Sequence, residues 1–157
     1  MNATNPPRLY SDLAWLWPLW GDPAGEYAGF ARHVAARIRQ RARRTVETFL
    51  DVACGGGKNL FTFKRSFRCV GLDLSPAMLE LARNLNPECE FVQGDMRSFD
   101  LGRAFDAILI DDGVSHLTTR DDLAAAFRTA FRHLTPGGVL AVAADATTET
   151  FRQNHTE

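Results

Sequence analysis

The chain has 157 residues, a formal net charge of −1 and a hydrophobic fraction of 45%. This length fits one domain with its own core, and the near-zero charge gives no global attraction to nucleic acid. The three cysteines form no CxxC motif and no cluster with histidine, which argues against a disulfide framework and a zinc site. The chain shows neither a signal-peptide pattern nor the roughly 18 apolar residues that span a membrane. We therefore expect a single soluble, cytoplasmic domain over residues 1–157 that has no membrane partner.

The first 45 residues are expected to form a helical lid or flap. Residues 1–24 are rich in aromatic residues and proline, with a short helix near 9–16 and a turn at Gly21-Asp22-Pro23. Residues 24–43 repeat apolar side chains every three to four positions, which predicts an amphipathic helix. Residues 32–44 contain six arginines and no acidic residue. They form either a solvated helix face or a surface that binds an anionic partner.

From residue 46 onward, apolar strand patterns and helix patterns alternate. Strands are expected at 48–53, 69–73, 90–93, 105–110 and 139–144. Helices are expected at 58–65, 75–85 and 120–134, with a turn at 135–138. Ser75 and Pro76 form a typical helix start. The alternation predicts an α/β fold: a Rossmann-like three-layer sandwich with a mostly parallel sheet of five strands.

Three glycines follow the first predicted strand, in Asp51-Val52-Ala53-Cys54-Gly55-Gly56-Gly57. Glycine lets the backbone turn sharply and approach a ligand, and the helix start behind the loop offers free N–H groups. The segment is neither a phosphate loop nor a GxGxxG motif, because Asn59 follows Lys58 and Leu60 takes the third glycine position. Taken alone, the loop is either a ligand site or a plain tight turn.

Acidic residues also end the next two strands. Asp73 can accept the hydroxyls of a ribose, or serve only as a turn residue. Asp95, in Gly94-Asp95-Met96, can accept a hydrogen bond from an adenine amine while Met96 packs on the ring. Because α/β sheets bind ligands at the carboxyl ends of their strands, we expect these acids to line one site with Asp51.

Five segments, taken in order, resemble the class I methyltransferases that use S-adenosylmethionine (SAM). They are LDVACGGGKNL (50–60), GLDLSPAML (71–79), FVQGDMRSF (91–99), FDAILID (105–111) and LTPGGVL (134–140). The resemblance implies SAM as cofactor, S-adenosylhomocysteine as product, and a strand order 3-2-1-4-5-7-6 with strand 7 antiparallel. It further implies these contacts: the methionine end of SAM on Asp51, Ala53, Gly55 and Gly57, the ribose on Asp73, and the adenine among Leu74, Met78, Asp95 and Met96.

The segment after the fourth strand is the best guide to the methyl acceptor. It reads Asp111-Asp112-Gly113-Val114-Ser115-His116-Leu117 and is similar to the Asn-Ser-x-x-His-Leu run of glycine N-methyltransferases and related small-molecule N-methyltransferases. The resemblance places Asp112 near the transferring methyl group, with Asp111 beside the cofactor and His116 on that group's histidine. It also places Tyr10 and Tyr27 in the N-terminal region that closes over SAM.

One difference from that group bears on the class of methyl acceptor. The arginine that clamps a substrate carboxylate after the fifth strand is missing from Ala143-Ala144-Asp145-Ala146. Asp111, Asp112 and Asp145 make the edge acidic instead, which predicts an amine or cationic acceptor that loses its proton to His116 or a carboxylate. Alternatively, Asp111 or Asp112 caps the following turn, and His116 is a packed structural residue.

The chain continues only briefly beyond its fifth predicted strand, whereas the family adds a helix and strands 6 and 7. A truncation, a short form with an exposed edge, or a homodimer that covers this edge would each explain this. Aminosugar N,N-dimethyltransferases also resemble the chain, including its Glu149-Thr150-Phe151. The predicted function is a SAM-dependent methyltransferase acting on a small-molecule acceptor, at an amine nitrogen.

Two alternatives to this enzyme stay open. One is a SAM-binding module without activity. The other, less favoured, is an RNA or other nucleic-acid methyltransferase that uses the arginines of 32–44, although no Asn/Asp-Pro-Pro-Tyr motif is present. The proposed chemistry needs no metal.

Overall fold

A computed structural model describes residues 7–145, 147, 149 and 150. Its α-helices are α1 (Glu26–Arg41), α2 (Leu60–Phe63), α3 (Pro76–Leu85) and α4 (Arg120–Arg132). The 3₁₀ helices are η1 (Arg8–Tyr10), η2 (Ala14–Leu19) and η3 (Gly113–His116). The strands are β1 (Thr48–Val52), β2 (Arg68–Asp73), β3 (Glu90–Gln93), β4 (Phe105–Asp111) and β5 (Leu134–Ala143). None of the helices in these ranges is both long enough and apolar enough to cross a membrane.

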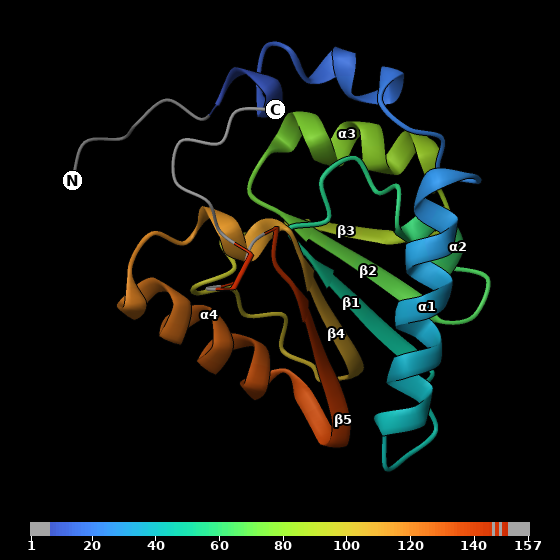
Figure 1. Cartoon of the computed structure of the whole chain (residues 1–157), viewed down its shortest axis with the longest axis vertical. Coiled ribbons are helices and arrows are strands. Elements are labelled where there is room, and N and C mark those ends of the chain that lie inside the picture. Colours follow the sequence, from blue (N-terminus) through green and yellow to red (C-terminus); the bar gives the residue numbers. More distant parts are fainter. Residues whose placement is uncertain (1–6, 146, 148, 151–157) are drawn as a thin grey trace.

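The five strands form one sheet in the order β3-β2-β1-β4-β5 (Figure 1). Every pairing among them is parallel. The predicted α/β class and the expected order of the first five strands are therefore confirmed. Parallel pairing also brings the carboxyl ends of β1, β2 and β4 to the same edge of the sheet, which is where α/β sheets bind ligands.

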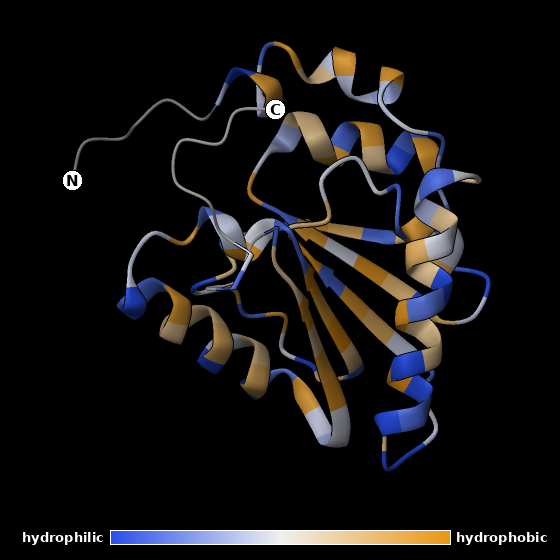
Figure 2. Ribbon diagram, viewed as in Figure 1, coloured by the Kyte–Doolittle hydropathy of each residue, from blue (hydrophilic) through white to orange (hydrophobic). Residues whose placement is uncertain are grey.

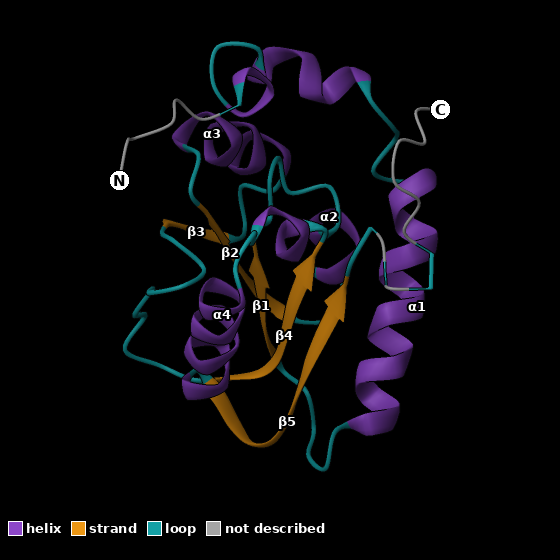
Figure 3. Cartoon of the chain, turned by 60° about the vertical axis from the view of Figure 1, so that its left-hand side comes forward, coloured by secondary structure: helices purple, strands orange, loops and turns teal. Residues whose placement is uncertain are grey.

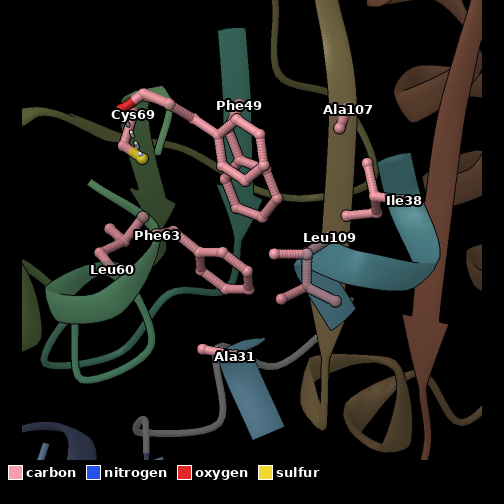
Figure 4. Close-up of a cluster of buried hydrophobic side chains, with 10 residues drawn as sticks. Ala31, Ile38, Phe49, Leu60, Phe63, Cys69, Ala107 and Leu109 are labelled. Atoms are coloured by element: carbon pink, nitrogen blue, oxygen red, sulfur yellow. Dashed lines mark hydrogen bonds between the residues drawn. The ribbon is translucent and has the colours of Figure 1, made fainter. Parts of the chain in front are cut away.

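Helices cover both faces of the sheet (Figure 3). Alternate residues of β1 point to opposite faces, so Phe49 packs with α1 and α2, while Leu50 packs in the cluster that includes Ala130 of α4. The Phe49 and Phe63 rings stack with 4.3 Å between centroids, as the close-up shows (Figure 4). The strands are mainly hydrophobic, whereas α1 and α4 alternate between hydrophobic and hydrophilic residues (Figure 2). This is the pattern of a sheet buried on both faces.

The N-terminal prediction of one helix near 9–16 is wrong. The segment forms two separate 3₁₀ helices, η1 and η2, with a turn between them. Pro18 lies inside η2 and has no N–H to donate, which disfavours an α-helix there. The helix expected over 58–65 is also shorter than predicted. Backbone hydrogen bonds between residues three apart, such as Thr62 N–H to the Asn59 carbonyl, form at the ends of α2, and this spacing is that of 3₁₀ turns.

The fifth strand begins earlier than expected. Leu134 pairs with Phe105 and Val139 pairs with Ala107, so the predicted turn at 135–138 is a bulge within β5. Gly137 has a φ of +82°, which glycine adopts without strain. The strand thus starts directly after α4, which ends at Arg132.

A buried carboxylate ties the amino ends of β1 and β4 together. Asp106 accepts hydrogen bonds from the backbone N–H groups of Glu47 and Thr48, both at 3.0 Å, and from the Thr48 hydroxyl at 2.9 Å. The Nε atom of Arg44 lies 2.7 Å from its other oxygen. Burial alone would raise the pKa of Asp106, but these hydrogen bonds outweigh it and lower the pKa.

Candidate functional site

Three acids meet at the carboxyl edge of the sheet, one from each of three neighbouring strands. Asp51 lies on β1, Asp73 ends β2 and Asp111 ends β4. The charges of Asp111 and Asp73 both act on Asp51, as expected for Asp73, whereas a place for Asp95 in the same site stays a prediction. Within the described ranges, no group of three or more metal-ligating side chains could hold a metal ion.

Asp51 is the most unusual of these acids. Asp51 is only 1% exposed, and neither of its carboxylate oxygens has a hydrogen-bond partner among the described residues. Burial raises its pKa well above the ordinary value, and the charges of Asp111 and Asp73 add to this effect. A buried carboxylate without a donor is costly, so this position suits a ligand that brings a donor.

The glycine loop has the backbone shape of a ligand-binding turn. Ala53, Gly55 and Gly57 have φ values of +60°, +52° and +76°. A Cβ atom added to Gly56 would lie 2.5 Å from Cδ1 of Trp17, so the indole packs directly on the loop. The missing side chain of Gly56 therefore serves the close approach of Trp17, and the role of the loop in binding a ligand stays a prediction.

Asp73 links this loop to the next helix. One of its oxygens accepts the Gly55 N–H and the other accepts the Ser75 N–H, both at 2.8 Å. The turn role considered from the sequence is therefore real, yet each carboxylate oxygen keeps a further lone pair for a ligand. Burial raises the pKa of Asp73, against these hydrogen bonds.

The residues expected around the adenine lie in different settings. Leu74 is 63% exposed beside Asp73, whereas Met78 is fully buried and packs in the core rather than at the open edge. Met96 is half-buried next to Gly113. The Asp95 carboxylate is already paired with the Arg97 guanidinium at 2.5 Å, which lowers the pKa of Asp95. The adenine contacts of these four residues stay predictions.

Asp112 stands in a strained backbone position at the acceptor side. Its φ is +51°, and its N–H donates to the Ala143 carbonyl at 3.0 Å. It occupies the first position before η3 without a capping hydrogen bond, so the alternative of a turn cap is wrong for Asp112. Burial, the Asp111 charge and the adjoining Asp145 carboxylate raise the pKa of Asp112 to about 6.

His116 and the N-terminal tyrosines lie over the same edge. His116 is exposed, so it is not a buried structural histidine, and its ring meets the Tyr10 ring edge-on with 5.6 Å between centroids. The Ser75 hydroxyl donates to the Tyr10 carbonyl at 2.5 Å. Burial raises the pKa of Tyr27, with contributions from the charges of Glu26, Asp112 and Asp111.

Two residues after the glycine loop were missed as site residues in the sequence. Lys58 is 5% exposed, and its Nζ donates to the Trp17 carbonyl at 2.9 Å and lies 5.0 Å from the centroid of the Tyr27 ring. Asn59 donates to Asp111 at 2.7 Å. Polar residues in the first turn after a glycine loop were the available signal, but a sequence does not show which strand end they reach.

The sequence matches the family model described as a methyltransferase domain over residues 49–138. The chain belongs to this methyltransferase family. It is 41% identical over 119 residues to the dTDP-3-amino-3,4,6-trideoxy-alpha-D-glucopyranose N,N-dimethyltransferase of Streptomyces venezuelae, covering 74% of this chain and 50% of that protein. It is 39% identical over 146 residues to the dTDP-3-amino-3,6-dideoxy-alpha-D-glucopyranose N,N-dimethyltransferase of Streptomyces fradiae, covering 90% and 57%. The chain thus spans about half the length of these curated relatives.

Solved structures agree with this assignment. Streptomyces venezuelae DesVI matches with a TM-score of 0.79 and 38% identity, covering 91% of this chain and 60% of that one. SAM-bound CalS10, an amino pentose methyltransferase from Micromonospora echinaspora, also matches with a TM-score of 0.79, at 35% identity, covering 99% and 64%. The Rossmann-like fold expected from the sequence is therefore shared with solved methyltransferases.

Proposed function

We propose that the chain binds SAM at the edge formed by β1, β2 and β4, and methylates an amine nitrogen on a nucleotide-linked amino sugar. The observation that carries the proposal is the buried Asp51 carboxylate, which has no donor among the described residues. The relatives named as dTDP-aminosugar N,N-dimethyltransferases support the acceptor class.

The residues present fit SAM. The Asp51 carboxylate suits the ammonium of its methionine end, because a cationic donor both satisfies and neutralises a buried carboxylate. The loop from Ala53 to Gly57 leaves room for a close backbone approach. Asp73 has free lone pairs for ribose hydroxyls, and the exposed Leu74 offers an apolar surface for the adenine.

The acidic side of the edge suits an amine. Asp111 and Asp112 would accept N–H groups of the acceptor and orient it, and Asp112 or His116 would take the proton that the amine must lose before it can attack. A pKa of about 6 leaves Asp112 mostly ionised at neutral pH and able to receive that proton. When bound, SAM supplies an electrophilic methyl carbon whose bond to sulfur breaks as the bond to nitrogen forms, which leaves S-adenosylhomocysteine.

We further propose a cytoplasmic location and a homodimer. Three free cysteines suit a reducing compartment. Within the described sheet, β5 is an edge strand whose Val142 is 43% exposed, and a second copy would cover it. The N-terminal segment would act as a lid, held by the contacts of Tyr10 and Trp17 described above.

The test is a methyl-transfer assay with labelled SAM and a panel of nucleotide-linked sugars. The matched pair is an amino sugar and the same sugar with a hydroxyl at that carbon. We expect mono- and dimethylated product from the amine alone. Equal transfer to both sugars would remove the amine assignment, and SAM binding without transfer to any acceptor would leave only a binding module.

A further inference from the structure

Asn59 joins the glycine loop to the end of β4. It lies directly before α2 and is 9% exposed. Its Nδ2 donates to Oδ2 of Asp111 at 2.7 Å, whereas its Oδ1 is buried without a partner among the described residues. One side chain thus connects the loop proposed to hold SAM with the carboxylate proposed to hold the acceptor.

This hydrogen bond favours the ionised form of Asp111. An ionised carboxylate only accepts hydrogen bonds, and the amide presents its nitrogen to Asp111 and leaves its own oxygen unpaired. Burial raises the pKa of Asp111, and the Asn59 hydrogen bond acts against that increase. Asn59 therefore stabilises the charged form of Asp111 against the effect of burial.

Asp112 interacts with a carboxyl group where Asp111 has an amide: its side chain is hydrogen-bonded to that of Asp145. Burial, the charge on Asp111 and this contact with Asp145 raise the pKa of Asp112 to about 6. Two adjacent carboxylates whose surroundings separate their affinities for a proton take different roles in proton transfer.

We propose that Asn59 is a positioning residue that holds Asp111 charged and oriented toward the amine acceptor, so that the proton of the acceptor passes to Asp112. This inference rests on the proposed function. Asn59 acts through Asp111, and the proton that leaves the nitrogen forms an O–H bond on the Asp112 carboxylate.

Several other titratable groups surround the two carboxylates. The groups that interact with them are Asp51 and Asp145, with Tyr10 from η1 and Tyr27 from α1. Since these neighbours include two more carboxylates, an unaided Asp111 would take up a proton more readily. Asp111 receives hydrogen bonds from the Asn59 amide and from the backbone N–H of Asp112, and both lower its pKa. Removing the Asn59 amide should therefore raise the pKa of Asp111.

The experiment compares Asn59→Leu with Asn86→Leu. Leucine keeps the branched shape of asparagine, with a larger volume, and removes the donor. Asn86 is the matched control because it is also buried and also donates from Nδ2 beside the loop, to the Gly57 carbonyl at 2.9 Å. Each protein is titrated by NMR of the Asp111 and Asp112 carboxyl carbons, and kcat and KM for the amino sugar are measured against pH.

We expect Asn59→Leu to titrate Asp111 at higher pH than the wild type. The acid limb of kcat/KM should move to higher pH with it, and kcat/KM near neutral pH should fall about tenfold, the usual cost of a hydrogen bond to a charged group. Asn86→Leu should move neither titration. If Asn59→Leu does not fold, Asn59→Ala removes the same donor and takes its place.

An unchanged Asp111 titration in the Asn59 variant would overturn the role of Asn59, and so would an equal change in the Asn86 variant. The titration needs no turnover, so it is separate from the proposed function. A wild-type protein that transfers no methyl group would overturn the proposed function instead, whatever the carboxyl groups do.

Discussion

Replacing Asp51 with asparagine is expected to stabilise the ligand-free protein while weakening its affinity for SAM. Asp51 is 1% exposed, and its oxygens have no hydrogen-bond donor in the described part of the chain. Its folded-state pKa is raised, first by burial and then by the charges of Asp111 and Asp73. The ionised form is thus easier to reach in the unfolded chain, so wild-type stability falls as pH rises from the unfolded toward the folded pKa.

The magnitude follows from the missing partners. A buried polar group without a hydrogen bond costs about 1–3 kcal/mol, and a charged one costs more. The asparagine amide keeps part of this cost, so we expect Asp51→Asn to gain about 1–2 kcal/mol at about pH 8. The gain should nearly vanish at about pH 3, below the ordinary pKa of aspartate, where the wild-type group is protonated in both states.

The assay is urea unfolding of ligand-free wild type and variant across that pH range. Asp121→Asn, at an exposed position in the first turn of α4, is the control and should change stability by less than about 0.5 kcal/mol. A variant less stable than wild type at the higher pH would refute the idea of an unpaired buried charge. A gain that does not depend on pH would refute the role of its ionisation.

Three further predictions concern other groups. Lys58→Met should release the N-terminal segment, because the Lys58 bond to the Trp17 carbonyl is lost, and hydrogen exchange of residues 8–20 should rise. Asp106→Asn should cost about 1–3 kcal/mol in urea unfolding, since it breaks the Arg44 pair. The pKa of Asp106 is lowered, so its contribution should be present above the unfolded pKa and be lost as pH falls through the folded pKa; an equal loss at all pH values would contradict this. Methyl transfer should fall to half on the acid side near pH 6, the pKa of Asp112, and in Asp112→Asn the acid limb should follow the titration of Asp111 alone.

The strands of the sheet could be predicted because they are short apolar runs separated by clear helix and turn signals, and their order followed from the resemblance to class I methyltransferases. The boundaries of β5 could not be predicted. The pattern of Thr135-Pro136-Gly137-Gly138 is typical of a turn, but in the structure the segment is a bulge within the strand. Its pairing with β4 decides this, and pairing between distant segments leaves no local signal. The two helices of the aromatic N-terminal segment could not be predicted either. They are 3₁₀ helices, which lack the sequence period of an α-helix.

The acids of the site could be predicted because each stands at or near the carboxyl end of a strand. What they contact could not. The pairing of Asp95 with Arg97 and the full burial of Met78 are seen only in the folded chain. The bond from Asn59 to Asp111 joins residues 52 positions apart, so only the folded chain shows it.

The central claim is that Asp51 receives the amino-acid end of SAM. Calorimetric titration of wild type and Asp51→Asn with S-adenosylhomocysteine and with 5′-methylthioadenosine, which lacks that end, tests it most directly. We predict that the variant binds S-adenosylhomocysteine about tenfold to a hundredfold more weakly, as for a lost hydrogen bond to a charged group, and binds 5′-methylthioadenosine as the wild type does. Equal weakening of both ligands, or of neither, would contradict the account.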